Sequence, residues 1–525
     1  MSDRLILAID LGTSGPKAAL VTPQGKIVAG EIEETDVILL PGGGAEQDPA
    51  AWWTAIGKAS QRLMKSAPAG AADRIAGIAV TTQWSGTVCV DQSGRHLMNS
   101  IIWMDSRGAE HVREMTGGFP SFEGYGLSKI LKYIRITGGA PGHSGKDSIA
   151  HILYIKKELP DIYEATYKFL EPKDFINLKL TGKFAASFDS IALHWVTDNR
   201  NINKIAYHPD LLAMAGIPVE KLPELKQSTD IFGELTPEAA ENLGIKAGIP
   251  VILGTPDLQS AAIGSGAVRD YEGHLYIGTS SWLTCHVPFK KTDIFHNMAT
   301  LPSAIPGRYF VANEQETAGY CLIYLRDKIF FAQDELGTGP VPKDAYERMN
   351  QAAEKIPAGS DGLIFTPWLY GERTPVEDNT VRGAFFNQSL KTTRAHMIRA
   401  AMEGVAFNAR WLLKYVEVFT RRKMNAINLI GGGARSPLWC QIIADVLDRT
   451  IRQIDDPVQA NTRGAGLLGA AALGLSTFAQ IADQIPVAGV YRPNPKNRRL
   501  YDSLFEEFQQ IYKQNKKIYA RLNGG

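Results

Sequence analysis

The chain has 525 residues, of which 44% are hydrophobic and 21% charged, and its formal net charge is +1. This length exceeds one compact core, so two or three domains are expected. The small net charge is evidence against nucleic acid or an anionic membrane as a partner. The four cysteines stand far apart and form no CxxC pair, which argues against structural zinc and a disulfide framework.

No apolar run reaches the roughly 18 residues that a membrane helix needs. The N-terminus enters an apolar strand directly, without a signal-peptide pattern. We therefore expect a cytoplasmic protein that associates with neither membranes nor nucleic acid.

The first apolar strand ends in a carboxylate, Asp10, followed by a turn with the residues Gly12, Thr13, Ser14 and Gly15. A buried strand holds a carboxylate at a fixed point, and glycines let backbone N–H groups approach a ligand. This combination suits a polyphosphate with Mg²⁺, because Mg²⁺ prefers oxygen ligands and retains several waters. An ordinary β-turn with a solvated aspartate is the alternative, since short glycine motifs also match by chance.

The segments that follow predict an α/β fold. Strands are expected at 17–22 and 26–34, as a hairpin beside the first strand. A helix is expected at 50–65, with Asp48 as its N-cap and Pro49 at its first position. Further strands are expected at 75–81, 88–91 and 101–105, before a mostly helical stretch at 106–170.

Two polar motifs follow strands of the first half, and their residues are Gln83, Trp84, Ser85, Gly86 and Trp103, Met104, Asp105, Ser106, Arg107. A tryptophan face suits sugar C–H groups, while amide, carboxylate and guanidinium groups bind hydroxyls. Core packing is the alternative for Trp103. A near match to a phosphate-binding loop at 140–147 lacks the first glycine, the closing hydroxyl and a preceding strand, so it is interpreted as a surface loop.

A short helix at 236–243, capped by Thr236, precedes a turn that we take as the domain boundary, which gives domains at 1–248 and 249–525. A new strand at 251–254 then leads to Asp257, expected near the N-terminus of a small-residue helix at 260–267. Asp257 is a candidate catalytic carboxylate, and simple helix capping is the alternative.

The second half repeats the hydroxyl-glycine turn. A strand at 274–277 runs into Gly278, Thr279 and Ser280, which predicts two related lobes that face one cleft. A triple glycine at 431–433 stands between a strand and a helix start, where a helix N-terminus favours phosphate or ribose oxygens. The segment 371–375 places an ion-pairable Glu and Arg in a tight loop, and a plain structural turn is the alternative. The C-terminal stretch 500–522 is expected to be a helix with a solvated basic face.

Taken together, these motifs resemble the FGGY family of carbohydrate kinases, nearest to its xylulokinase members. The resemblance runs nearly end to end and rests on AIDLGTSG (8–15), EQDPAAWW (46–53), IIWMDSR (101–107), PKDFINLKLTGKF (172–184), GTPD (254–257), IGTSS (277–281), GERTP (371–375), AAMEG (400–404) and IGGGARSPLW (430–439). It implies two actin/hexokinase-type, ribonuclease-H-like ATPase domains around a central cleft, with ATP and Mg²⁺ as cofactors.

The resemblance also implies roles for individual residues. Asp10 would organise the Mg–ATP phosphates, with the metal held through water, and Asp257 would be the base that takes the proton from the sugar hydroxyl. The residues expected at the phosphates are Gly12, Thr13, Ser14, Gly278, Thr279 and Ser280, and those expected at adenosine are Gly432, Gly433 and Ala434. The residues expected around the sugar are Gln83, Trp84, Ser85, Trp103, Asp105, Arg107 and Asp257.

The chain departs from the family pattern at the sugar. Xylulokinases typically carry Gln-Met-His-Gly where this chain has Gln83-Trp84-Ser85-Gly86, and a serine reaches less far than an imidazole. The family signatures are also altered at His151, Tyr154 and Asn387. The positions of the phosphates and of the base are retained.

The sequence thus predicts an ATP- and Mg-dependent kinase for a small sugar, with D-xylulose as the nearest guess and a homodimer left open. The substrate alternatives are ribulose or another ketose, glycerol or another polyol, and an aldonic acid, the last favoured if Arg107 or Arg373 faces the sugar. A non-catalytic sugar sensor and an actin-like ATPase are alternatives from other classes. The presence of both Asp10 and Asp257 argues against the sensor.

Overall fold

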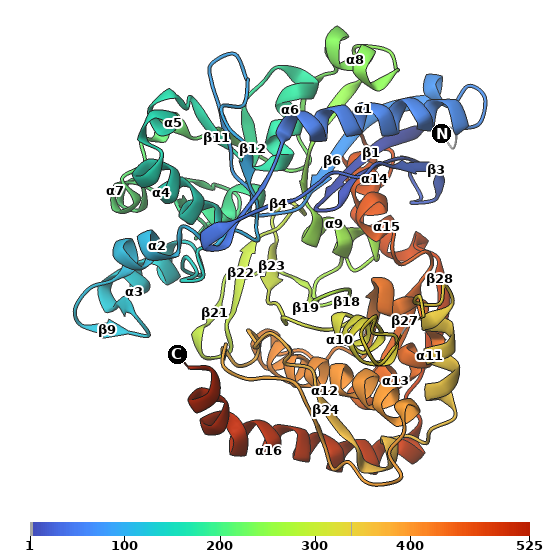
Figure 1. Ribbon diagram of the computed structural model, residues 1–525. Helices are drawn as coiled ribbons and strands as arrows, with labels where there is room; N and C mark the ends of the chain where they lie inside the picture. The colour runs from blue at the N-terminus through green and yellow to red at the C-terminus, as the bar shows by residue number, and fades with distance from the viewer. Residues whose placement is uncertain (1–3, 338, 525) are drawn as a thin grey trace.

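The computed structural model describes residues 4–337 and 339–524. Each half of the chain builds one large sheet, with helices around it (Figure 1). The sheet of the first half has the strand order β16-β17-β6-β1-β2-β3. Its strands are β1 (Leu5–Gly12), β2 (Gly15–Val21), β3 (Ile27–Ile32), β6 (Ile75–Thr82), β16 (Ile231–Glu234) and β17 (Pro250–Pro256).

Strands β1, β2 and β3 form the expected antiparallel hairpins, and β6 and β17 add in parallel. The parallel strands are buried along nearly their whole length, as apolar runs of this kind favour. Strand β17 carries a bulge at Gly254, whose φ is +77° and where a Cβ atom would lie 1.9 Å from the Val80 oxygen. Only glycine lets the two backbones come this close.

Some helices of the first half pack against this sheet, and the others lie beside it around a separate buried cluster. Helix α1 (Pro49–Ser66) confirms the expected helix, because the Asp48 side chain accepts a hydrogen bond of 2.8 Å from the Ala50 N–H. The other helices of this half are α2 (Ala109–Thr116), α3 (Leu127–Ile136), α4 (Ser148–Glu158), α5 (Pro160–Ala165), α6 (Pro172–Thr181), α7 (Pro209–Ala215) and α8 (Pro237–Leu243). The strand expected at 101–105 is wrong beyond Ile101: β8 is Ser100–Ile101, and the Asp105 N–H turns back to the Ile102 oxygen at 2.9 Å.

The second half repeats the arrangement in a sheet of order β19-β18-β26-β27-β28. Its strands are β18 (Gly273–Ile277), β19 (Ser281–Thr284), β26 (Ala426–Ile430), β27 (Thr450–Ile454) and β28 (Val487–Tyr491). An antiparallel hairpin again flanks parallel strands, since β18 pairs antiparallel with β19 and parallel with β26. This confirms the two related α/β lobes.

Smaller sheets and further helices complete the molecule. The small sheets are β4-β5-β8 and β20-β23-β22-β21, with β4 (Ile38–Leu40), β5 (Gly44–Gln47), β20 (His286–Val287), β21 (Thr292–Asp293), β22 (Met298–Pro302) and β23 (Tyr309–Ala312). The helices of the second half include α11 (Ala345–Glu354), α12 (Arg394–Thr420), α13 (Pro437–Leu447) and α16 (Arg498–Asn523). Within residues 4–337 and 339–524, no helix is long and apolar enough to cross a membrane.

The division of the chain expected at residue 248 needs correction. Strand β17, which follows that point, pairs with β6 in the first sheet, and helix α9 (Asp257–Gly264) continues directly from it. A fresh apolar strand after a turn is a weak sign of a boundary, because parallel strands join a sheet from far along the chain. We propose instead that the division lies between α9 and β18.

The chain returns to the first lobe near its end. Helix α14 (Ala460–Ala472) packs on the first sheet, where Ala465 and Ala470 belong to one buried cluster with Ile6 and Ile252. Figure 1 shows α14 in the upper lobe, close to β1, although most of the later chain lies in the lower lobe. The two lobes are therefore joined by more than one crossing of the chain.

Candidate active site

Two carboxylates stand at the same edge of the first sheet. Asp10 lies near the end of β1, and Asp257 begins α9 immediately after β17. Because β6 lies between these strands, they are roughly 10 Å apart. Asp10 is only 2% exposed, and its Oδ2 accepts hydrogen bonds from the Thr462 hydroxyl at 3.0 Å and from the Lys17 ammonium at 3.4 Å.

The half-buried carboxyl of Asp257 has an unusual proton affinity. Burial is the largest cause that raises its pKa, to about 7, and the charges of Asp10 and Glu314 raise it further. The Leu258 N–H, 2.7 Å away, and the Lys17 charge act in the opposite direction. A carboxyl that titrates near neutral pH can accept a proton during a reaction.

The first turn lies among residues that we expected at the sugar. The Thr13 hydroxyl donates to Gln83 Oε1 at 2.9 Å and accepts from Trp103 Nε1 at 3.0 Å. Gln47, which the sequence analysis did not single out, donates to the Thr13 oxygen at 2.8 Å and accepts from Gln83 at 2.7 Å. The Thr13 hydroxyl is thus engaged toward Gln83 and Trp103, whereas the neighbouring Ser14 is exposed.

The turn 102–107 places Arg107 between two carboxylates. Its guanidinium contacts buried Asp105 at 2.7 Å and Glu46 at 2.6 Å, and it lies 4.6 Å from the centre of the Tyr154 ring. Asp105 also accepts a hydrogen bond of 2.9 Å from the Ala45 N–H. The positive charge of Arg107 is therefore matched from within the protein.

Three hydrogen bonds fix the segment 84–86. The Trp84 indole donates to the Ser190 oxygen at 2.9 Å, and the Ser85 hydroxyl donates to the Lys146 oxygen at 2.6 Å. The Gly86 N–H donates to the buried carboxyl of Glu171 at 3.0 Å. The Ser85 side chain is thus engaged by the backbone, and its φ of +62° is unusual for a residue other than glycine.

The turn after β18 and the glycine loop after β26 lie against one another. A Cβ atom at Gly431 would lie 2.4 Å from the Ile277 oxygen, and one at Gly433 would lie 2.4 Å from the Ile277 side chain. Thr279 and Gly432 are exposed, and Gly278 and Ser280 are half-buried. Ala434 is buried, and its oxygen accepts from Gln453 at 2.7 Å.

Tyr276 connects this second lobe to the carboxylates. Burial raises its pKa to about 12, and the charges of Asp257 and Asp10 add to the effect. The end of β18 therefore lies close enough to both carboxylates for their charges to reach it. The structure thus brings the expected phosphate turns of both lobes to the same region.

Arg373, which the sequence made a candidate contact for an acidic sugar, lies between two carboxylates. Arg373 contacts Glu314 at 2.5 Å and also pairs with Glu316. Glu372 is buried and its pKa is raised to about 7, mainly by burial, while Asn408 donates to it at 2.5 Å. Both carboxylate partners of Arg373 come from the segment 314–316 rather than from its own loop.

Lys146 is the exception to this pattern of pairing. Its side chain is half-buried, and burial together with the Arg373 charge lowers its pKa, while Glu316 and Glu314 act in the opposite direction. The loop 140–147 follows a helix, α3, rather than a strand, which agrees with its rejection as a phosphate-binding loop. It is not a plain surface loop, because Asp147 accepts from the Trp195 indole at 2.8 Å.

Some of the missed residues had a sequence signal. Lys17 faces Asp10 because the hairpin register pairs the two positions, and this register follows from the short turn at 12–15. Thr462 reaches Asp10 from 452 residues further along the chain, so only the tertiary structure could reveal it. Glu171 and Gln47 likewise act through contacts that no local pattern predicts.

Comparisons with known proteins agree with this arrangement. Residues 5–264 match the N-terminal domain of the FGGY family of carbohydrate kinases, and residues 274–473 match its C-terminal domain. The chain is 28% identical to the xylulose kinase of Bacillus subtilis, over 99% of both chains. It is also 26% identical to the gluconokinase of the same organism, over 98% of this chain and 97% of that protein.

Solved structures give the same result. The ligand-bound xylulose kinase of Lactobacillus acidophilus superposes with a TM-score of 0.85 and 26% identity, covering 99% of this chain and 100% of that one. The gluconate kinase from that organism has the same TM-score and identity, covering 99% of both chains. The two family domains and the two-lobed fold together show that this chain belongs to the FGGY family and is a carbohydrate kinase.

Proposed function

We propose that this kinase transfers the γ-phosphoryl group of ATP to D-xylulose and so forms xylulose 5-phosphate. The observation that carries the proposal is the state of Asp257. Its half-buried carboxyl has a pKa raised to about 7, and it lies at the same end of the first sheet as Asp10. In this scheme Asp257 takes the proton from the attacking sugar hydroxyl, and the oxygen attacks the γ-phosphorus as its bond to ADP breaks.

The phosphate side of the site is proposed from the two turns and the glycine loop. Backbone N–H groups of Gly278 and Thr279 would bind phosphate oxygens, and the exposed Gly432 would let adenosine approach the backbone. Closure of the lobes would exclude water and so limit hydrolysis of ATP.

Asp10 fits a magnesium site of the kind that ATP brings with it. Among the described residues, no group of three or more His, Cys, Asp or Glu side chains could hold a metal ion by itself. Mg²⁺ is commonly bound by one or two carboxylates together with phosphates and waters, and a single buried carboxylate suits that. When bound, the ion would neutralise charge on the phosphates.

The charges around the sugar favour a neutral substrate over an aldonate. Both arginines that could have bound a carboxylate are already paired: Arg107 with Asp105 and Glu46, and Arg373 with Glu314 and Glu316. Each pairing leaves one excess negative charge, which repels an acidic sugar.

Gluconate is the second candidate, on two observations. A gluconokinase and a gluconate kinase are among the similar proteins. In addition, half-buried Lys146 forms no ion pair with any described residue, and its backbone oxygen accepts a hydrogen bond from Ser85. An ammonium group at this position could bind an aldonate carboxylate.

The test measures ADP release from Mg–ATP with xylulose, ribulose, other ketoses, glycerol and gluconate, for the wild type and Asp257→Asn. We expect xylulose to give the highest kcat/KM and the variant to lose on the order of 10²–10⁴ in turnover. Higher kcat/KM with gluconate, lost in Lys146→Met, would establish the second candidate. A variant as active as the wild type would overturn the role of Asp257, and no turnover with any sugar would favour a sensor.

A further inference from the structure

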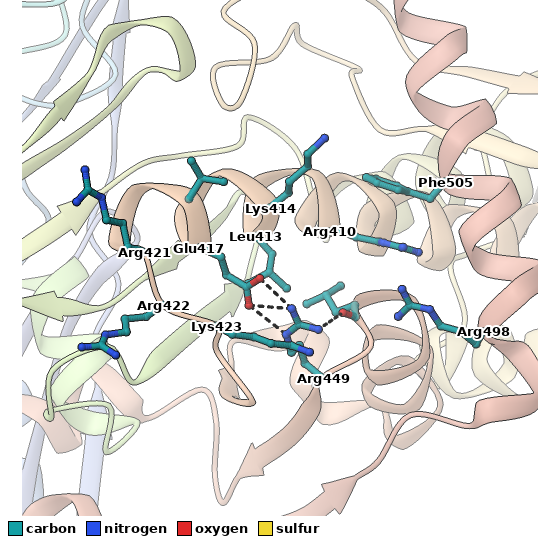
Figure 2. A pocket seen from close by; sticks show the side chains of 12 residues that line it. Arg410, Leu413, Lys414, Glu417, Arg421, Arg422, Lys423, Arg449, Arg498 and Phe505 are labelled. Carbon is teal, nitrogen blue, oxygen red and sulfur yellow. Dashed lines mark hydrogen bonds and ion pairs between the residues drawn. The ribbon is translucent and has the colours of Figure 1, made fainter.

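A basic hollow lies on the second lobe, separate from the candidate active site. It has a volume of about 500 Å³ and is lined by α12 near its C-terminal end, by the segment that follows α12, and by residues of α13, α16 and the turn before β27 (Figure 2). None of its lining residues belongs to the candidate active site. We define the basic hollow by its seven cationic side chains, which fall into two sets.

The first set is a neutral floor, in which three arginines meet three carboxylates: Arg410, Arg449 and Arg498 with Glu417, Asp448 and Asp502. Arg449 donates to both carboxylate oxygens of Glu417 at 2.8 Å. Arg498 lies 2.6 Å from Asp448 and 2.7 Å from Asp502. These three positive charges are matched within the protein and leave no excess.

The second set is a cationic rim of four exposed side chains: Lys414, Arg421, Arg422 and Lys423. Within the described part of the chain, no carboxylate pairs with any of them. Two of them contact aromatic rings instead: Arg422 lies 5.5 Å from the centre of the Tyr271 ring, and Lys414 lies 5.7 Å from the centre of the Tyr415 ring. Four unmatched positive charges are thus gathered at one place in a chain whose net charge is only +1.

The C-terminus of α12 explains only part of this concentration. Cations are favoured near a helix C-terminus because it carries about half a negative charge. That compensates only a fraction of one side chain and leaves more than three positive charges unmatched. Like charges crowded in this way repel one another, so an anion that binds among them removes an unfavourable interaction.

The spacing of the rim selects the kind of anion. Lys414 lies six residues before Thr420, the last residue of α12, or roughly 9 Å along the axis, and Arg421 follows the helix end with a left-handed backbone (φ +54°). One phosphate group cannot reach both ends, whereas two phosphate groups on one small molecule can. Figure 2 shows Lys414 extending from the body of the helix, and Arg421 and Arg422 extending from its end. Long side chains held only at their base can close over such a ligand.

We propose that the basic hollow binds a small molecule with two or more phosphate groups, at a site distinct from that of ATP. Contacts with the rim would be charge-assisted hydrogen bonds, which are the stronger class. The floor arginines, already paired, would hold the helix end in place rather than bind the ligand.

The test titrates the full-length protein with inorganic tripolyphosphate by calorimetry. Saturating ADP fills the nucleotide site, and the buffer contains no divalent metal, because metal would bind the probe. We expect one saturable site, with inorganic phosphate at least tenfold weaker. The variant Lys414→Ala/Arg421→Ala/Lys423→Ala should bind at least about tenfold more weakly, since it loses several charge-assisted contacts.

The matched control is Lys513→Ala/Lys516→Ala/Lys517→Ala, which removes the same number of exposed cations from α16. It should retain wild-type affinity. Equal weakening in both triple variants would mean diffuse attraction by a basic surface and would overturn the proposal, as would the absence of a saturable site in the presence of ADP. If the thermal unfolding of the triple rim variant differs from that of the wild type, the single variant Arg422→Ala is titrated in its place.

Discussion

Among single residues, Asp257 is the one whose surroundings most alter its chemistry. The free carboxyl of an aspartate is ionised at neutral pH, but burial and the nearby charges of Asp10 and Glu314 raise the pKa of Asp257 to about 7. A proton acceptor works best when its pKa lies near the working pH. Lys17 tempers the shift, and it does so from the same hairpin that carries Asp10.

This pKa predicts the pH dependence of the reaction. Asp257 accepts a proton only when ionised, so kcat/KM for the sugar should rise with pH and reach half of its plateau near pH 7. Glu314→Gln removes a charge that raises the pKa of Asp257, so its profile should move to lower pH. The measurement is kcat/KM between pH 5 and 9, with Glu354→Gln, an exposed residue of α11, as the control. A profile that stays in place in Glu314→Gln would contradict the coupling.

Among the elements, helices α9 and α14 lie in close backbone contact although they are far apart in sequence. A Cβ atom at Gly264 would lie 1.8 Å from the Ala460 oxygen, and one at Gly464 would lie 1.8 Å from the Ser260 oxygen. Backbone atoms cannot move aside as a flexible side chain can. The two glycines therefore set the distance between α9, which begins with Asp257, and α14, which carries Thr462 to Asp10.

Gly464→Ala should accordingly destabilise the protein. Alanine in a helix interior would by itself gain about 1 kcal/mol over glycine, but overpacking typically costs about 1–3 kcal/mol, and here the obstacle is backbone. We expect a net loss of about 2 kcal/mol in the free energy of unfolding, measured by urea denaturation. Gly339→Ala, where an added Cβ meets no atom within 4 Å, should leave it unchanged. Equal urea midpoints for Gly464→Ala and Gly339→Ala would contradict this prediction, because they would show that α9 and α14 move apart at little cost in free energy.

Across the whole molecule, the first lobe depends on a late segment of the chain to complete its core. The face of the first sheet that carries Ile6 and Ile252 is covered by Ala465 and Ala470 of α14, which follow the second lobe in sequence. A fragment that ends after α9 would leave this apolar face open to water. Its exposure costs roughly 25 cal/mol per Å².

The fragment 1–264 should therefore not reach the native fold by itself. We expect it to bind a dye specific for exposed apolar surface and to lack a cooperative thermal transition. When the same fragment is mixed with residues 265–525 and the lobes reassemble, dye binding should fall and a cooperative thermal transition should return. The intact chain is the control. An isolated fragment that unfolds cooperatively at the temperature of the intact chain would refute the shared core.

The sequence alone predicted much of the local structure and the family. Helix α1 with its Asp48 cap, the first hairpins and the strand before the triple glycine follow from short-range patterns, namely apolar periodicity, capping and turn residues. The family motifs predicted the two-lobed fold. Asp10 and Asp257 were recognisable because each follows a buried strand.

Only the tertiary structure decided the rest. It assigned β17 to the first sheet rather than to a new domain, and it brought Thr462 to Asp10 across 452 positions. It also showed that Arg107 and Arg373 are already paired with carboxylates, which weakens the case for an acidic sugar that these arginines had raised. Parallel strand pairing, charge pairing and pKa shifts depend on which distant segments meet in space, and no local pattern in the chain records that.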